Sequence, residues 1–187
     1  MTGEQESEGK ALLKAIAAKD ESAIAAFYRL YESTVYRFSL SRLNDPIAAA
    51  DILNEVMMEV WKSAAKFEGR SKVSTWLLGI THFKIIDQFR AKKRHEHEEM
   101  DDDIADESPA VQQDALLEAT QDAQLLKHAL SKLSPEHRQV LHLAFFEDMN
   151  YREIGQVMGV SEGTIKSRIY HAKKLAKTQL QRLMVAP

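Results

Sequence analysis

One segment of this chain is so acidic that it divides the remainder into two parts. Residues 96–122 contain 11 Asp/Glu and no Lys or Arg, whereas residues 22–95 contain 12 Lys/Arg against 7 Asp/Glu and residues 123–187 contain 10 against 5. Densely spaced like charges, few apolar residues and Pro109 oppose a packed core, so we expect a flexible acidic linker over 96–122. The sequence therefore predicts two domains, at 22–95 and 123–187, preceded by an N-terminal leader at 1–21.

Charge and composition narrow the class of protein. The net charge of the chain is −3 because the acidic segment outweighs the positive charge of the two basic segments. The separation of basic from acidic segments favours a polyanionic partner such as nucleic acid. The chain has no cysteine, which excludes disulfides and thiolate metal sites. No apolar run approaches 18 residues and the first ten residues are polar, so we expect neither a membrane span nor a signal peptide. A cytoplasmic protein is the resulting expectation.

Apolar residues recur at helical spacing in both predicted domains, and no useful alternating pattern of a β-strand appears. In the first domain we expect helices over 23–38, 48–66 and 73–94, with a break at Asn44–Pro46 and a loop at Phe67–Ser71. In the second, Ser134 followed by Pro135 predicts a capped helix start. The expected fold class is all-α, with two small helical domains.

A helix-turn-helix is predicted between Tyr151 and Lys174. Tyr151–Met158 forms the first helix, Gly159 suits a turn of positive φ, and Ser161 suits the N-cap of the second helix. Ile165, Ile169 and Ala172 would face inward. The opposite face would carry cations, a hydroxyl and an aromatic ring, at Lys166, Ser167, Tyr170, His171 and Lys174. Such a face suits the major groove of DNA better than a purely structural role in a small bundle.

Taken together, five blocks in order resemble bacterial sigma factors of the extracytoplasmic-function group, in the sigma-70 family. Besides the helix-turn-helix, the blocks are Asp51–Val56 with Trp61, Phe67–Ser71 followed by Ser74–Leu77, Ile86–Asp87 with Phe89–Arg90, and Leu133–Leu141. The similarity extends from about Ala23 to Leu183, the linker excepted. Five blocks in the right order are far more specific than any one of them.

The resemblance implies a division of labour between a sigma region 2 at 22–95 and a sigma region 4 at 123–187. Core RNA polymerase would be bound by Asp51, Glu55, Val56 and Trp61. The −10 promoter element would be bound by the cations of the loop and of the helix that follows it, namely Arg70, Lys72, Lys84, Arg90, Lys92, Lys93 and Arg94. The −35 element would be bound by Lys166, Ser167, Tyr170, His171 and Lys174, with Arg168 and Lys173 on phosphates. An anti-sigma factor that buries these faces is also implied, whereas no cofactor, metal or catalytic residue is.

Two positions depart from the family pattern. Ala48–Ala50 stands where an acidic run commonly precedes Asp51, so polymerase docking would depend more on Asp51, Glu55 and apolar contacts. Phe83 stands where such proteins commonly carry Asn, so one polar contact to a −10 base would be absent or made by another residue. Trp76 could stack on a base, but its apolar neighbours favour a place in the core.

Alternatives remain open. An enzyme is disfavoured because no Gly-rich phosphate loop or Ser/His/Asp arrangement stands out, and His95–Glu98 is more typical of a solvated charged run than of a metal site. A dimeric regulator could use the same helix-turn-helix without polymerase, but it would not need a second basic domain. A pure protein-interaction module is the third class. The acidic linker could also shield the basic faces, which replacing Asp101–Asp103 with Ser would reveal as higher nonspecific DNA affinity.

Overall fold

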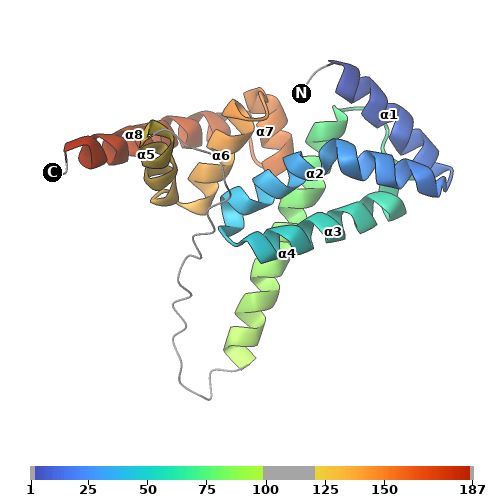
Figure 1. The fold of residues 1–187 in the computed structure, drawn as a ribbon, viewed down its shortest axis with the longest axis horizontal. Coiled ribbons are helices and arrows are strands. Elements are labelled where there is room, and N and C mark those ends of the chain that lie inside the picture. The colour runs from blue at the N-terminus through green and yellow to red at the C-terminus, as the bar shows by residue number, and fades with distance from the viewer. Residues whose placement is uncertain (1–2, 99–120, 186–187) are drawn as a thin grey trace. The chain divides into compact units, whose positions relative to one another are not determined.

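The computed structural model describes residues 3–98 and 121–185, and all regular structure within them is helical (Figure 1). These helices form two compact units. The first contains α1 (Gly3–Ala17), α2 (Glu21–Leu43), α3 (Pro46–Ser63), the 3-10 turn η1 (Ala64–Lys66) and α4 (Val73–Glu98). The second contains α5 (Gln121–Ser131), α6 (Pro135–Phe145), α7 (Tyr151–Met158) and α8 (Glu162–Val185). The all-α prediction with two helical domains is confirmed, while most of the predicted linker lies outside the described residues.

Side-chain caps fix where the helices of the first unit begin. The Asp20 carboxylate accepts from the Ser22 amide at 2.9 Å, and the Asp45 carboxylate accepts from Ile47 and Ala48 at 2.9 and 3.1 Å. These caps satisfy amides that lack a partner within their own helix. The hydrogen bonds to Ser22 hold the pKa of Asp20 below its ordinary value. The predicted break at Asn44–Pro46 is confirmed, since Asn44 ends α2 in the left-handed conformation and Pro46 opens α3.

The core of the first unit lies between α2, α3 and α4. Its fully buried side chains include Phe27, Tyr31, Val35, Phe38, Ile52, Val56, Val60, Leu77, Leu78 and Ile85. The α2 residues among them recur at three- and four-residue spacing, as the sequence predicts for a buried stripe. Removing this much apolar surface from water is the main source of stability in a unit of this size.

The stretch predicted as a leader belongs to the first unit. Gly3–Ala17 is a helix that packs on α2, η1 and α4, and it buries Leu13 and Ile16 (Figure 1). The first ten residues are polar, which led to the prediction of a leader. The apolar residues that anchor this helix to the unit come only after Lys10. At the other end of the unit, α4 continues to Glu98, so the first residues of the predicted linker are helical.

In the second unit, the helices α6 and α7 begin at N-caps formed by residues close to them in sequence. Ser134 accepts from the His137 amide at 3.3 Å, so the predicted start of α6 is confirmed. Asn150 and Glu153 form a reciprocal capping box at the start of α7, at 3.0 and 2.9 Å. The core includes Val140, Leu143, Ile154, Val157 and Ile165, all fully buried.

Candidate functional site

The exposed side of α3 combines carboxylates with apolar side chains. Asp51 and Glu55 are both exposed, as predicted, and lie four residues apart on one face. Ile47 and Met58 continue that face at helical spacing, and Ile47 is 77% exposed. We call Ile47, Asp51, Glu55 and Met58 the docking face. Large apolar side chains beside exposed charges are typical of a protein-binding surface.

Val56 and Trp61, which were also predicted to bind core polymerase, are less exposed than the docking face. Val56 is fully buried between the helices, so its side chain is part of the core and not available to a partner. Its position, one residue after Glu55, turns it to the inner face of α3. Trp61 is only half-buried, and the Lys19 ammonium lies 4.9 Å from its ring centre and donates to its carbonyl at 3.4 Å. Trp61 is therefore partly covered from the α1–α2 turn.

Lys84 lies against the carboxylates of α3. Its Nζ is 3.8 Å from Glu55 Oε2 and 4.0 Å from Glu59 Oε2, and the side chain is half-buried. The role of Lys84 in binding the −10 element stays a prediction, and its charge lies between α4 and α3 in the free protein. Partly exposed pairs of this kind add little stability.

The segment Phe67–Lys72, which we call the Gly69 loop, connects η1 to α4. Gly69 has a φ of 71°, a conformation that L side chains rarely adopt. The Phe67 ring packs on the Trp76 ring with centroids 5.3 Å apart, so the start of the loop is anchored on α4. Arg70 is exposed and pairs with Glu68 at 2.6 Å, and Lys72 is exposed as well. Trp76 is half-buried in this contact, so it is neither fully in the core nor fully exposed.

The outer side of α4 carries aromatic rings and cations. Phe83 is 59% exposed, and Phe89 is exposed beside the Arg42 guanidinium, 5.4 Å from its ring centre. Arg90 is exposed and pairs with Asp87 at 3.5 Å, and Lys92 is exposed. Lys93 and Arg94 belong to α4, but their side chains lie outside the described residues. Aromatic faces interspersed with cations are the elements from which single-stranded nucleic acid sites are built.

In the second unit, α7 and α8 form the predicted helix-turn-helix. Gly159 ends α7 with φ 66° and ψ 30°, and its amide and that of Val160 both donate to Gly155 O. Ser161 then caps α8 by accepting from the Thr164 amide at 3.2 Å. A Cβ at Gly155 would lie 2.7 Å from the Val160 carbonyl oxygen, so the close approach of the turn to α7 requires glycine there. No local sequence pattern signals the requirement for this second glycine.

The outward side of α8 matches the predicted face. Ile165, Ile169 and Ala172 are buried, as predicted, which leaves the opposite side to solvent. We call the exposed residues Lys166, Ser167, Tyr170, His171 and Lys174 the recognition face. Tyr170 is 65% exposed and meets the His171 ring edge-on at 5.4 Å, while Lys166 pairs with Glu162 at 2.9 Å.

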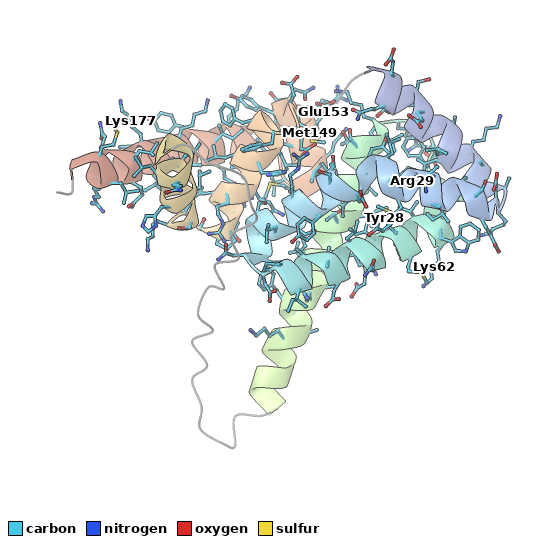
Figure 2. The ribbon with its side chains drawn as sticks, viewed as in Figure 1. Tyr28, Arg29, Lys62, Met149, Glu153 and Lys177 are labelled. Atoms are coloured by element: carbon cyan, nitrogen blue, oxygen red, sulfur yellow. The ribbon has the colours of Figure 1, made fainter. Side chains whose placement is uncertain are left out.

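Further cations flank the recognition face. Arg168 is half-buried, and Lys173 is exposed with its ammonium 4.9 Å from the Phe145 ring centre. The helix-turn-helix carries two further cations that were not predicted as DNA contacts. Arg152 is exposed in the first turn of α7, and Lys177 projects from α8 (Figure 2). The basic excess of residues 162–182 already signalled Lys177. Both helices of the motif therefore carry cations that can meet a DNA backbone.

The described part of the chain shows neither a metal-binding cluster nor a membrane-spanning helix. Among these residues no group of three or more His, Asp or Glu side chains could hold a metal ion. The side chains of His95–Glu98 lie outside that part. No described helix is long and apolar enough to cross a membrane.

Comparisons with known proteins agree with this layout. Residues 27–95 match the family model "Sigma-70 region 2", and residues 129–174 match "Sigma-70, region 4". The chain is 29% identical to the ECF RNA polymerase sigma factor SigK of Mycobacterium tuberculosis, over 87% of this chain and 88% of that protein. It is also 29% identical to SigM of Bacillus subtilis, over 85% and 96%. Its fold is similar to that of the sigma factor RpoE of Bartonella quintana, solved with the anti-sigma factor NepR, with a TM-score of 0.70, 24% identity and coverage of 82% and 94%.

Proposed function

We propose that the two units divide the work of a sigma factor between them, since this chain belongs to the sigma-70 family, in its extracytoplasmic-function group. A protein of this family binds core RNA polymerase and directs transcription initiation at promoters, so it is a transcription factor. Its place of action would be the bacterial cytoplasm, where it meets polymerase and DNA.

The recognition face would read the −35 element as duplex DNA. The observation that carries this proposal is that five exposed polar, basic and aromatic side chains share one side of a capped helix behind a glycine turn. In such motifs the second helix enters the major groove and its exposed residues contact base edges. Lys166 and Tyr170 belong to the face and would contact bases, while Arg168, Lys173 and Lys177 would contact phosphates.

The docking face would bind core polymerase, and the Gly69 loop with the outer side of α4 would bind the melted −10 element. Asp51 and Glu55 supply charge to the first contact and Ile47 and Met58 supply apolar area. For the second, Arg70, Lys72, Arg90 and Lys92 would meet the backbone. Exposed Phe83 offers a ring on which a base could stack, in place of the polar contact that the family pattern leads one to expect.

Two pairs of substitutions should separate promoter reading from polymerase docking. Lys166→Ala with Tyr170→Ala removes a base-side cation and a ring, and each good base contact is worth about 1–3 kcal/mol. We therefore expect at least about a tenfold loss of promoter-specific transcription with unchanged affinity for core polymerase. Asp51→Ala with Glu55→Ala should weaken polymerase binding by at least about tenfold, while the free protein binds duplex DNA as before.

The measurement is co-elution with purified core polymerase, combined with transcription from a mapped promoter. Glu32→Ala and Glu136→Ala serve as controls, since both remove a carboxylate outside the proposed faces. A wild-type chain that failed to co-elute as a 1:1 complex, but bound paired half-sites as a dimer, would favour the regulator that acts without polymerase. Equal losses of both activities in every variant would contradict the division of labour.

We further propose that an anti-sigma factor holds the protein inactive. RpoE of Bartonella quintana was solved with one, and the docking face here leaves Ile47 and Met58 uncovered in the first unit. A protein that covered this face would compete directly with polymerase. Expressed alone, the chain should drive transcription without restraint, and co-expression of the product of a neighbouring gene should abolish that activity. No effect from any candidate antagonist would count against the proposal.

A further inference from the structure

The N-terminal helix α1 lies outside both matched family regions, the first of which begins at residue 27. It contacts the chain on both sides of the Gly69 loop: η1 immediately before the loop, and α4 immediately after it (Figure 1). A loop whose two ends are fixed by the same rigid helix has fewer conformations available than one held at a single end. The packing of α1 therefore bears on the shape of the Gly69 loop.

One side chain of α1 makes a specific bond at the end of that loop. The Val73 amide, the first of α4, donates to Glu6 Oε1 at 2.8 Å, across 67 positions of sequence. Lys10 Nζ lies 3.6 Å from the same oxygen, and the Glu6 side chain is only 17% exposed. Glu6 Oε2 is shielded from solvent and takes no hydrogen bond among the described residues. A carboxylate held at a helix N-terminus is stabilised by the helix dipole and satisfies an otherwise unpaired amide.

The sequence next to α4 offers no local substitute for this cap. Lys72 precedes the helix, and a lysine side chain has no acceptor atom. Ser71, one residue earlier, uses its hydroxyl to donate to Lys72 O at 3.3 Å. The cap is thus supplied from α1, whereas α2, α3, α6, α7 and α8 are each capped from the residue immediately before them.

A second contact holds the chain before the loop. Lys19, at the end of the α1–α2 turn, lies over the Trp61 ring and donates to its carbonyl. Between them, Glu6 and Lys19 hold the segment from Trp61 to Val73, which includes η1 and the whole Gly69 loop.

We propose that α1 positions the Gly69 loop for the −10 element and that Glu6 is the positioning residue; this rests on the proposed function of the loop. By fixing the first amide of α4, Glu6 determines where the helix starts and so how many residues remain in the loop. That in turn sets the placement of Arg70 and Lys72 relative to Trp76 and Phe83 on α4. Glu6 itself contacts no DNA in this proposal.

The test compares Glu6→Ala, which removes the acceptor, with Glu6→Gln, which keeps an amide oxygen, in the full-length protein. Glu4→Ala is the matched control, because Glu4 is an exposed carboxylate in the first turn of the same helix. Amide exchange at Val73 should be at least about tenfold faster in Glu6→Ala, the factor expected when a charge-assisted hydrogen bond is lost. Glu6→Gln should stay within about threefold of wild type, and Glu4→Ala should not differ.

The functional measurement uses holoenzyme assembled with core polymerase on a promoter from which the wild type initiates. Glu6→Ala should reduce the rate of promoter opening about tenfold while its affinity for core polymerase stays within twofold, and Glu6→Gln should restore most of the rate. Equal losses of polymerase affinity and opening, or no rescue by Gln, would reduce Glu6 to a purely structural role and overturn the proposal. Unchanged Val73 exchange in Glu6→Ala would overturn it as well. A wild-type chain that bound polymerase but initiated nowhere would instead refute the proposed function, and the exchange rates would still decide whether Glu6 holds the loop.

Discussion

Gly155→Ala is expected to lower the melting temperature of the second unit by about 10 °C and to abolish binding of the recognition face to duplex promoter DNA. The added Cβ would lie 2.7 Å from the Val160 carbonyl oxygen, which is backbone and cannot rotate away. Overpacking of this kind costs about 1–3 kcal/mol, of which the better helix propensity of Ala recovers less than 1 kcal/mol. A net loss of about 2 kcal/mol in a unit of this size gives that shift. Because Val160 leads into α8, relief of the overlap would move the recognition face.

Differential scanning calorimetry of the full chain, with DNA binding measured below the transition, checks this expectation. Gly163→Ala is the matched control, since its new Cβ would meet nothing closer than the Ser161 hydroxyl at 3.8 Å. That variant should be as stable as wild type or slightly more so. A Gly155→Ala protein with an unchanged melting temperature would show that the turn can shift without cost, and that the close approach does not constrain the motif.

Gly9→Ala should destabilise the first unit by about 2 kcal/mol and loosen α1 from α2. A Cβ at this position would overlap the Tyr31 hydroxyl and lie 3.0 Å from its Cζ. Tyr31 cannot swing aside, because its side chain is fully buried and its ring packs against Phe27 with centroids 4.6 Å apart. Burial, with smaller effects from Glu6 and Glu8, also raises the pKa of Tyr31, so the hydroxyl remains a neutral donor near the Gln5 carbonyl.

Urea unfolding measures the loss of stability in Gly9→Ala, and amide exchange measures the loosening of α1. Gly79→Ala is a suitable control, because it lies inside α4 and its Cβ would have open space within 4 Å. In Gly9→Ala, amide exchange should show a lower free energy of local unfolding for α1 than in the wild type. Because Glu6 of α1 caps α4, exchange at Val73 should also be faster. Loss of stability spread evenly over both units would argue against a local effect of α1.

The two glycine variants also separate the proposed activities. Gly155→Ala acts in the second unit and should leave the docking face and the Gly69 loop intact. Gly9→Ala acts in the first unit and should leave the recognition face intact. A protein whose −35 and −10 contacts come from separate units should therefore lose them one at a time.

The sequence by itself determined most of the second unit and the all-α class. Helix periodicity, the Ser134 and Ser161 caps and the turn at Gly159 each depend on residues within a few positions of one another, so their pattern can be read along the chain. The buried and exposed sides of α8 follow from the same periodicity, which is why the recognition face agrees with the prediction.

Only the tertiary structure decided how the first unit presents its residues. Val56 and Glu55 are neighbours in sequence, yet one is core and the other surface. Lys84, predicted as a DNA contact, also lies within ion-pairing distance of Glu55 and Glu59 on a neighbouring helix. Glu6 meets the Val73 amide across 67 positions, a distance over which local pattern carries no information. Long-range pairing depends on how helices pack against one another, and that packing places α1 against η1 and the start of α4, on either side of the Gly69 loop.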